Sequence, residues 1–229
     1  MAYVPLQTLI NKQDFSEIVR DQIGLILVDE VANQMALAIA ATEDPALWDL
    51  KIYLERHNPI EDWLNPDIET ATLSELAPVV NISYDAASVD LSQSDHIETQ
   101  KYIGTFNIDV YAMGLSQDQV TGHIPSDKDS SYKVQAAVRL VRNILMASTN
   151  IQLQLPEIVH DRMIQSMTMQ PLAPEVVGVQ QISGARLVFE VGYRELSPQF
   201  VGGTLEEINL KLCRAEDGSL LSEMTFDYT

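Results

Sequence analysis

The sequence predicts an α+β fold in which a mostly antiparallel sheet carries two main helices on one face. Two segments, at about 14–41 and 130–149, have apolar residues at helical spacing. Other segments alternate between apolar and polar residues, as strands with one packed side do, at 79–85, 101–114, 162–170 and 185–195. Runs of strands separated by a helix, without strict alternation of strand and helix, favour this class over a parallel α/β sheet.

The 229 residues predict a single α+β domain, residues 1–229, with a short helical insertion at 44–76 and a terminal hairpin at 206–228. The first main helix has Asp14 placed as its cap, with Glu17 three positions on as in a capping box. Its apolar stripe consists of Val19, Ile23, Ile26, Leu27, Val31, Met35, Ala38 and Ile39. Because its most apolar stretch also contains Asp29 and Glu30, it predicts a core helix rather than a membrane span.

The insertion at 44–76 contains Asp44-Pro45 and Asn58-Pro59, and each pair has the pattern of a helix start. Two short helices would then carry both tryptophans, Trp48 and Trp63. Two interpretations of the tryptophans stay open. They pack back onto the core, as aromatic residues commonly do, or they present anchors to a partner chain.

The strands predict one apolar face that packs under the helices. The residues expected on it include Val80, Ile82, Tyr84, Tyr102, Gly104, Phe106, Ile108, Val110, Leu187, Phe189, Val191 and Tyr193. Met163, Met167 and Met169 are expected together on one side of their strand. Arg186, Glu190 and Arg194 are expected to point outward. Asp109 also falls on the polar side and needs no special role.

The second main helix is basic in an acidic chain, which has 33 Asp and Glu, 14 Lys and Arg, and a net charge of −19. Its core face is formed by Val134, Ala137, Val138, Val141, Ile144 and Leu145. Asp129 or Ser130 is placed to cap it. Arg139 and Arg142 share another face, so we expect them to point outward or along an edge. They either pair with carboxylates of another chain or form salt bridges within this one.

The terminal hairpin at 206–228 is apolar on alternate positions, with a turn expected at Asp217-Gly218. Its apolar residues include Ile208, Leu210, Leu212, Leu220, Met224 and Phe226. Because a lone two-stranded hairpin is only marginally stable in water, we expect it to pack on its own sheet or on that of another chain. It would then help to join subunits, for example by strand addition.

No catalytic, cofactor-binding or metal-binding motif is present, so we expect no enzyme activity, no cofactor and no metal. The single cysteine, Cys213, excludes an intramolecular disulfide and a thiolate cluster. The four histidines lack metal-ligand spacing: His57, His96, His123 and His160. The net charge argues against a protein that holds nucleic acid or an anionic membrane. The cysteine count fits synthesis in a reducing cytoplasm, and the first ten residues do not predict a signal peptide.

The segments ETQKYIGTFNIDVYAMGLSQD (98–118) and VQAAVRLVRNILMAST (134–149) resemble tail terminator, or tail-completion, proteins of tailed bacteriophages. Proteins of this family have a strand of the form polar-x-F-x-I-D-x-Y, a loop with Gly and Ser, and a helix rich in Ala, Val, Leu and Arg. The order of elements agrees from about residue 12 to 229. The insertion and the terminal hairpin exceed the minimal family pattern.

The resemblance implies a homo-oligomeric ring of six subunits at the tail–neck junction of the virion, assembled in the host cytoplasm. Such a ring caps the tail tube and contacts the tube protein, the neck or connector protein and, where the tail has one, the sheath protein. DNA would only pass through an acidic lumen, and no membrane is involved. The alternatives are another neck component (a head–tail connector, a stopper or a sheath-side terminator), or a small ligand-binding domain or enzyme. The interface candidates are Lys133, Arg139, Arg142, Trp48, Trp63, Ile208, Leu210, Leu212, Met224 and Phe226.

Overall fold

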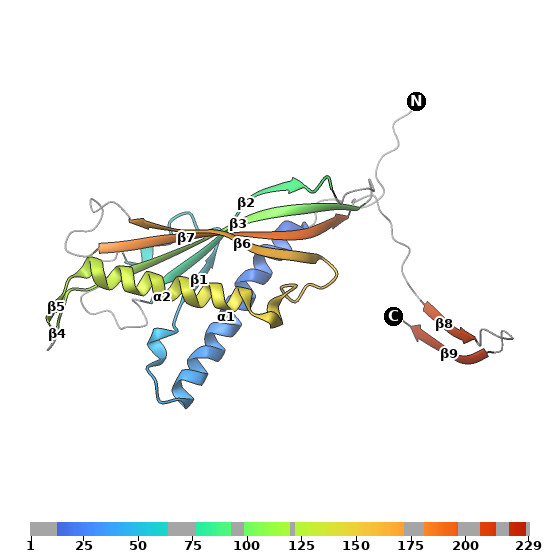
Figure 1. Cartoon of the computed structure of the whole chain (residues 1–229), viewed down its shortest axis with the longest axis horizontal. Coiled ribbons are helices and arrows are strands. Elements are labelled where there is room, and N and C mark those ends of the chain that lie inside the picture. The colour runs from blue at the N-terminus through green and yellow to red at the C-terminus, as the bar shows by residue number, and fades with distance from the viewer. Residues whose placement is uncertain are drawn as a thin grey trace, which may run out of the picture.

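The computed structural model of this chain describes residues 13–63, 77–92, 99–119, 122–171, 181–196, 207–213 and 220–227. Five strands form one sheet in the order β1-β2-β3-β7-β6, and two long helices lie against one of its faces (Figure 1). The strands are β1 (Lys51–Leu54), β2 (Val79–Val89), β3 (Thr99–Gly114), β6 (Val159–Pro171) and β7 (Gln181–Leu196). The helices are α1 (Phe15–Ala40) and α2 (Ser126–Met146). The predicted α+β fold is confirmed.

The sheet is antiparallel except where β1 runs parallel to β2. On the helix-facing side, Ile108 of β3 lies opposite both Ile82 and Leu187, and all three are fully buried. The alternation predicted for β2, β3 and β7 is thus confirmed. These residues form one core with the inner faces of α1 and α2.

Strand β6 departs from simple alternation because it contains two irregularities, one of them between Ile164 and Ser166. An extra residue in one strand reverses the facing of the residues that follow it. Met163 therefore lies opposite Glu190 on the polar face, whereas Met167 lies opposite Leu187 on the helix-facing side. The prediction that three methionines share one side was therefore wrong for Met163, whereas Met167 and Met169, opposite Leu187 and Ala185, do lie on the same side.

The insertion at 44–76 is only partly helical. Two 3-10 turns, η1 (Pro45–Leu47) and η2 (Glu61–Trp63), occur near the predicted starts, and the Asp44 side chain accepts a hydrogen bond from Ala46 N at 3.0 Å. Between them lies strand β1, which the prediction missed. Four residues are too few to show an alternation, and β1 is stabilised by pairing with β2, which is distant in the sequence. Residues 64–76 of the insertion lie outside the described residues.

Helix α1 starts as predicted, with both hydrogen bonds of the capping box between Asp14 and Glu17 present. Helix α2 begins earlier than predicted, after Pro125, which provides no side-chain cap. Because proline has no side-chain acceptor, this start leaves no capping signal in the sequence.

Asp129 and Ser130 lie inside α2 and fasten it to the sheet instead of capping it. Asp129 accepts a hydrogen bond from Leu115 N at 3.0 Å, and the Ser130 and Ser183 hydroxyls lie 2.7 Å apart. At the same place the backbone of Gly114 closely approaches α2, where a Cβ would overlap the carbonyl oxygen of Ser126. Just before α2, a two-stranded ribbon is formed by β4 (Gln117–Gln119) and β5 (Gly122–Ile124).

The polar face of the sheet contains an ion pair with a buried carboxylate, which the sequence did not reveal. Arg186 donates two hydrogen bonds to the Asp109 carboxylate, at 2.6 and 2.8 Å, and Asp109 is only 7% exposed. The hydrogen bond to Asp109 raises the pKa of Arg186 above its ordinary value. Such a bidentate pair fixes the register of β3 against β7.

The predicted terminal hairpin is present as β8 (Glu207–Cys213) and β9 (Leu220–Asp227), which form a separate two-stranded sheet. In its register, Ile208 lies opposite Phe226 and Leu210 lies opposite Met224. The expected turn at 217–218 lies outside the described residues. What the hairpin packs against, including through Leu212, stays a prediction.

Candidate functional site

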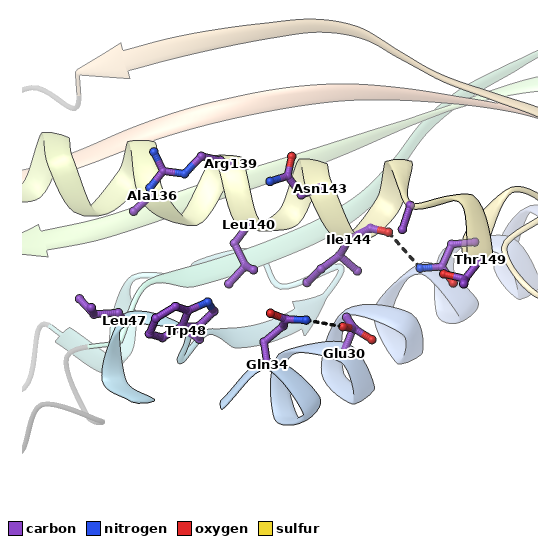
Figure 2. A pocket seen from close by; sticks show the side chains of 12 residues that line it. Glu30, Gln34, Leu47, Trp48, Ala136, Arg139, Leu140, Asn143, Ile144 and Thr149 are labelled. Atoms are coloured by element: carbon purple, nitrogen blue, oxygen red, sulfur yellow. Dashed lines mark hydrogen bonds between the residues drawn. The ribbon is translucent and has the colours of Figure 1, made fainter. Parts of the chain in front are cut away.

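A hollow of about 530 Å³ lies between α1, η1 and α2, and we call it the central hollow (Figure 2). Figure 2 shows Leu140 and Ile144 extending from α2 towards Gln34 and Glu30 of α1, with Trp48 at one end. Two of the predicted interface candidates, Trp48 and Arg139, line this hollow. The structure therefore brings together residues that are far apart in the sequence.

The walls of the central hollow carry opposite charges. On α1, Glu30 Oε1 accepts hydrogen bonds from Gln34 Nε2 at 2.7 Å and from Asn33 Nδ2 at 3.1 Å, which hold its carboxylate in place. On α2, Arg139 is exposed and forms no ion pair or hydrogen bond within the described part of the chain. Leu47 adds an apolar rim that is 71% exposed. The hollow thus presents one guanidinium and an apolar surface.

A second hollow, of about 540 Å³, lies between α2 and the edge strand β6, and we call it the methionine groove. Its lining consists of Arg142, Met146, Arg162, Met163, Ile164 and Met167. Arg142 is exposed and, like Arg139, has no ion pair with the residues that the structure describes. The intrachain salt bridges considered for these two arginines are not present among those residues.

Arg162, in the same groove, is engaged within the chain. Its guanidinium donates hydrogen bonds to the carbonyl oxygens of Leu145, Ala147 (2.8 Å) and Ile151 (3.1 Å) at the end of α2. Desolvation lowers the pKa of Arg162 below its ordinary value. Sequence reasoning missed this residue because its acceptors are backbone carbonyls more than ten positions away, which leave no pattern in the sequence.

The remaining candidates lie elsewhere. Trp63 is 1% exposed and packs with Val79, Met113 and Ile182 on the polar face of the sheet, which favours the interpretation in which it packs inward. Lys133 forms an ion pair with Asp129 at 2.8 Å, so its charge is already used within the chain. The five candidates on the terminal hairpin are described only through the pairing of their strands.

Within the described ranges, no group of three or more His, Cys, Asp or Glu side chains is placed to hold a metal ion. His160, near the methionine groove, has its pKa lowered mainly by burial and further by Lys101 and Arg194. Nothing in its described surroundings assigns it a reaction. The predictions of no metal, no cofactor and no enzyme activity stay predictions.

Helix α1 is long and apolar enough to cross a membrane, by length and composition alone, with 33% of its most apolar 18-residue window buried. The core helix of a soluble protein passes the same test, and the inner face of α1 packs on this sheet.

A comparison of the chain with models of known protein families found no match, and a search of curated proteins found none either. Function is therefore inferred from the residues of this chain and from their placement.

Proposed function

We propose that this protein is a structural component of a tailed-phage virion. In this proposal it is a tail terminator that forms a ring at the head-proximal end of the tail, caps the tail tube and joins it to the neck. The observation that carries the proposal is the pair of exposed arginines, Arg139 and Arg142, each beside a hollow and without an ion pair among the described residues. In a chain of net charge −19, such cations are suited to carboxylates of another acidic chain.

The acidic composition also agrees with a channel for DNA. A ring of strongly acidic subunits repels phosphate, so DNA would pass through its lumen without binding. This role requires assembly surfaces rather than catalytic groups. Another neck component, such as a stopper, a connector or a sheath-side terminator, would use the same kind of surface.

A ligand-binding domain is the second candidate, and the central hollow favours it. Its volume of about 530 Å³ falls within the range of roughly 300–1,000 Å³ that is typical of small-molecule sites. Its mixed lining, with Trp48 beside Arg139, is compatible with an aromatic anion.

The two candidates differ in oligomeric state. Size-exclusion chromatography with light scattering and negative-stain microscopy of the full chain should show a hollow ring of about six subunits, as a C6 assembly requires. Added tail tubes should be capped by the ring at one end only. A monomer that binds small anions in the central hollow would overturn the proposal, and rings that bind elsewhere in the neck would favour the other neck components.

Charge reversal tests the arginines directly. The double variant Arg139→Glu/Arg142→Glu should lose ring assembly and keep the circular dichroism spectrum and melting temperature of the wild type, because both side chains are exposed. Lys128→Glu/Arg194→Glu is the matched control, since it reverses two exposed charges that line neither hollow. Normal assembly of the first variant would contradict the role given to the arginines.

A further inference from the structure

Helix α1 has a second apolar face that nothing in the described structure covers. Its inner face includes Ile23 and Leu27, both fully buried in the core. On the opposite side, a row that we call the outer stripe consists of Leu25, Val28, Ala32, Ala36 and Ile39. Steps of three and four residues place all five on one side of a helix.

The outer stripe is exposed to an unusual degree for its composition. Leu25, Val28 and Ile39 are 56%, 49% and 64% exposed. Ala32 and Ala36 are exposed as well, and Figure 1 shows the C-terminal half of α1 extending away from the sheet. At 1.5 Å per residue it is about 21 Å long. A helix that is apolar on both sides is normally buried on both, and an exposed apolar row of this kind marks a contact site.

The charges around the stripe restrict what can cover it. Residues 21–50 contain six carboxylates and no Lys, Arg or His, and exposed Asp29 lies beside the stripe. Pairing α1 with α1 of another copy would bring carboxylates together, which is unfavourable. The covering surface should therefore combine apolar side chains with a free cation.

The methionine groove has these properties. Met146 and Met167 are 45% and 50% exposed, and flexible methionine side chains adapt to an inserted helix. Arg142 supplies the cation, because Arg162 already binds the end of α2.

The two surfaces share no residue and involve different strands of the sheet. Helix α1 contacts β1, β2, β7 and α2, whereas the groove lies between α2 and the edge strand β6. They do not meet within one chain, so they are available to join one copy to the next. A contact between two different surfaces of identical subunits is head-to-tail and closes into a ring when the rotation between subunits allows it.

We propose that the outer stripe of α1 docks in the methionine groove of a neighbouring copy, with Asp29 paired to Arg142. This inference rests on the self-assembly in the proposed function and assigns the two surfaces that form the contact. It does not depend on the tail or on the neck, so it can fail while the ring itself is real.

A charge swap tests the pairing. Asp29→Arg and Arg142→Asp should each raise the protein concentration at which half of the chains assemble by at least tenfold, measured by mass photometry. An equimolar mixture of the two variants should assemble again, because each stripe then meets a groove of opposite charge. The double variant Asp29→Arg/Arg142→Asp should also recover. Single variants that assemble like the wild type would overturn the pairing.

Cross-linking tests the geometry without weakening the contact. In a Cys213→Ser background, Ala32→Cys/Met167→Cys should give a ladder of covalent oligomers on mild oxidation, whereas either cysteine alone should give none. Dimers from Ala32→Cys alone would show that α1 pairs with itself and would overturn the proposal. Rings that form without a ladder in the double variant would also overturn it and would leave the proposed function standing.

A wild type that stays monomeric would remove both proposals. Flotation with phosphatidylcholine vesicles addresses the remaining occupant of the stripe, a lipid surface. We expect no flotation, and vesicle binding lost on Leu25→Asp would assign the stripe to a membrane and overturn the docking.

Discussion

The two long helices cover the same sheet but differ in how much of their apolar surface this chain buries. Helix α2 is amphipathic, with Val141 and Leu145 fully buried and charged residues outside. Helix α1 is apolar on its buried face and on its exposed face. The ends differ as well. The Asp14 side chain caps the start of α1, whereas α2 starts without a side-chain cap. The last turn of α1 contains no basic residue, whereas Arg162 donates a hydrogen bond to the Ala147 carbonyl just after α2.

The buried faces of the two helices stabilise the fold, whereas the outer stripe of α1 is available for assembly. The apolar face of α2 is buried within one molecule, and its exposed side is mostly polar, apart from Tyr132 and Met146. The outer stripe of α1 is left exposed by the described part of the chain and would be buried only in contact with another surface. The same residue type on two sides of α1 should therefore have two different roles.

The largest effect is expected from Leu27→Ala on the inner face of α1. Leu27 is fully buried, so truncation should lower the free energy of unfolding by about 2–5 kcal/mol through the lost contacts and the cavity left behind. Leu25→Ala, the matched change on the outer stripe, should cost about 0.5 kcal/mol or less in stability. It should weaken self-assembly instead. Urea denaturation at a protein concentration too low for assembly measures the free energy of unfolding of both variants. Equal losses of that free energy would contradict the distinction between the inner face and the outer stripe.

A smaller effect is expected where α2 ends. Arg162→Ala removes hydrogen bonds from a charged group to three carbonyl oxygens and should cost about 1.5–3 kcal/mol. Arg162→Lys keeps the charge but not the planar fork, so its loss should be intermediate. Thermal denaturation followed by circular dichroism measures both. If Arg162→Ala melts like the wild type, the end of α2 does not depend on β6.

The smallest effect is expected at the start of α1. Asp14→Ala removes the acceptor for Glu17 N, a bond of 3.0 Å, and should cost about 1 kcal/mol. Asp14→Ser retains a capping oxygen and should lower the free energy of unfolding by only about a few tenths of a kcal/mol. Chemical denaturation can resolve the two losses. A loss as large for serine as for alanine would indicate that the carboxylate charge, and not the cap, stabilises this end.

Local patterns in the sequence were sufficient for much of the fold. The capping box of α1 and the alternation in β3 and β7 each need only neighbouring residues, and both are present. Strand β1 was missed because its four residues depend on a distant partner, β2. The Asp109–Arg186 pair was missed for a related reason. Alternation placed both residues on the polar face, but only the register between two strands could bring them together.

The candidate site was likewise predictable in part from the sequence. The helical spacing predicted that Arg139 and Arg142 point outward, and both are exposed. That Arg139 shares a hollow with Trp48 and Glu30 follows from how α1, η1 and α2 pack, which no spacing within one segment encodes. The outer stripe of α1 could have been noticed from its composition, but a single apolar helix does not reveal which of its faces the chain will bury.

The close approach of Gly114 to α2 has a consequence for tracing this protein through evolution. Any larger residue would place a carbon atom on the Ser126 carbonyl, so the strand end and the helix start have to change together. Surface residues and even core residues can be replaced while the packing is kept, but the glycine at this junction cannot be replaced by a larger residue. A distant homologue should therefore keep this glycine twelve positions before the first residue of the helix, even where the surrounding residues have diverged.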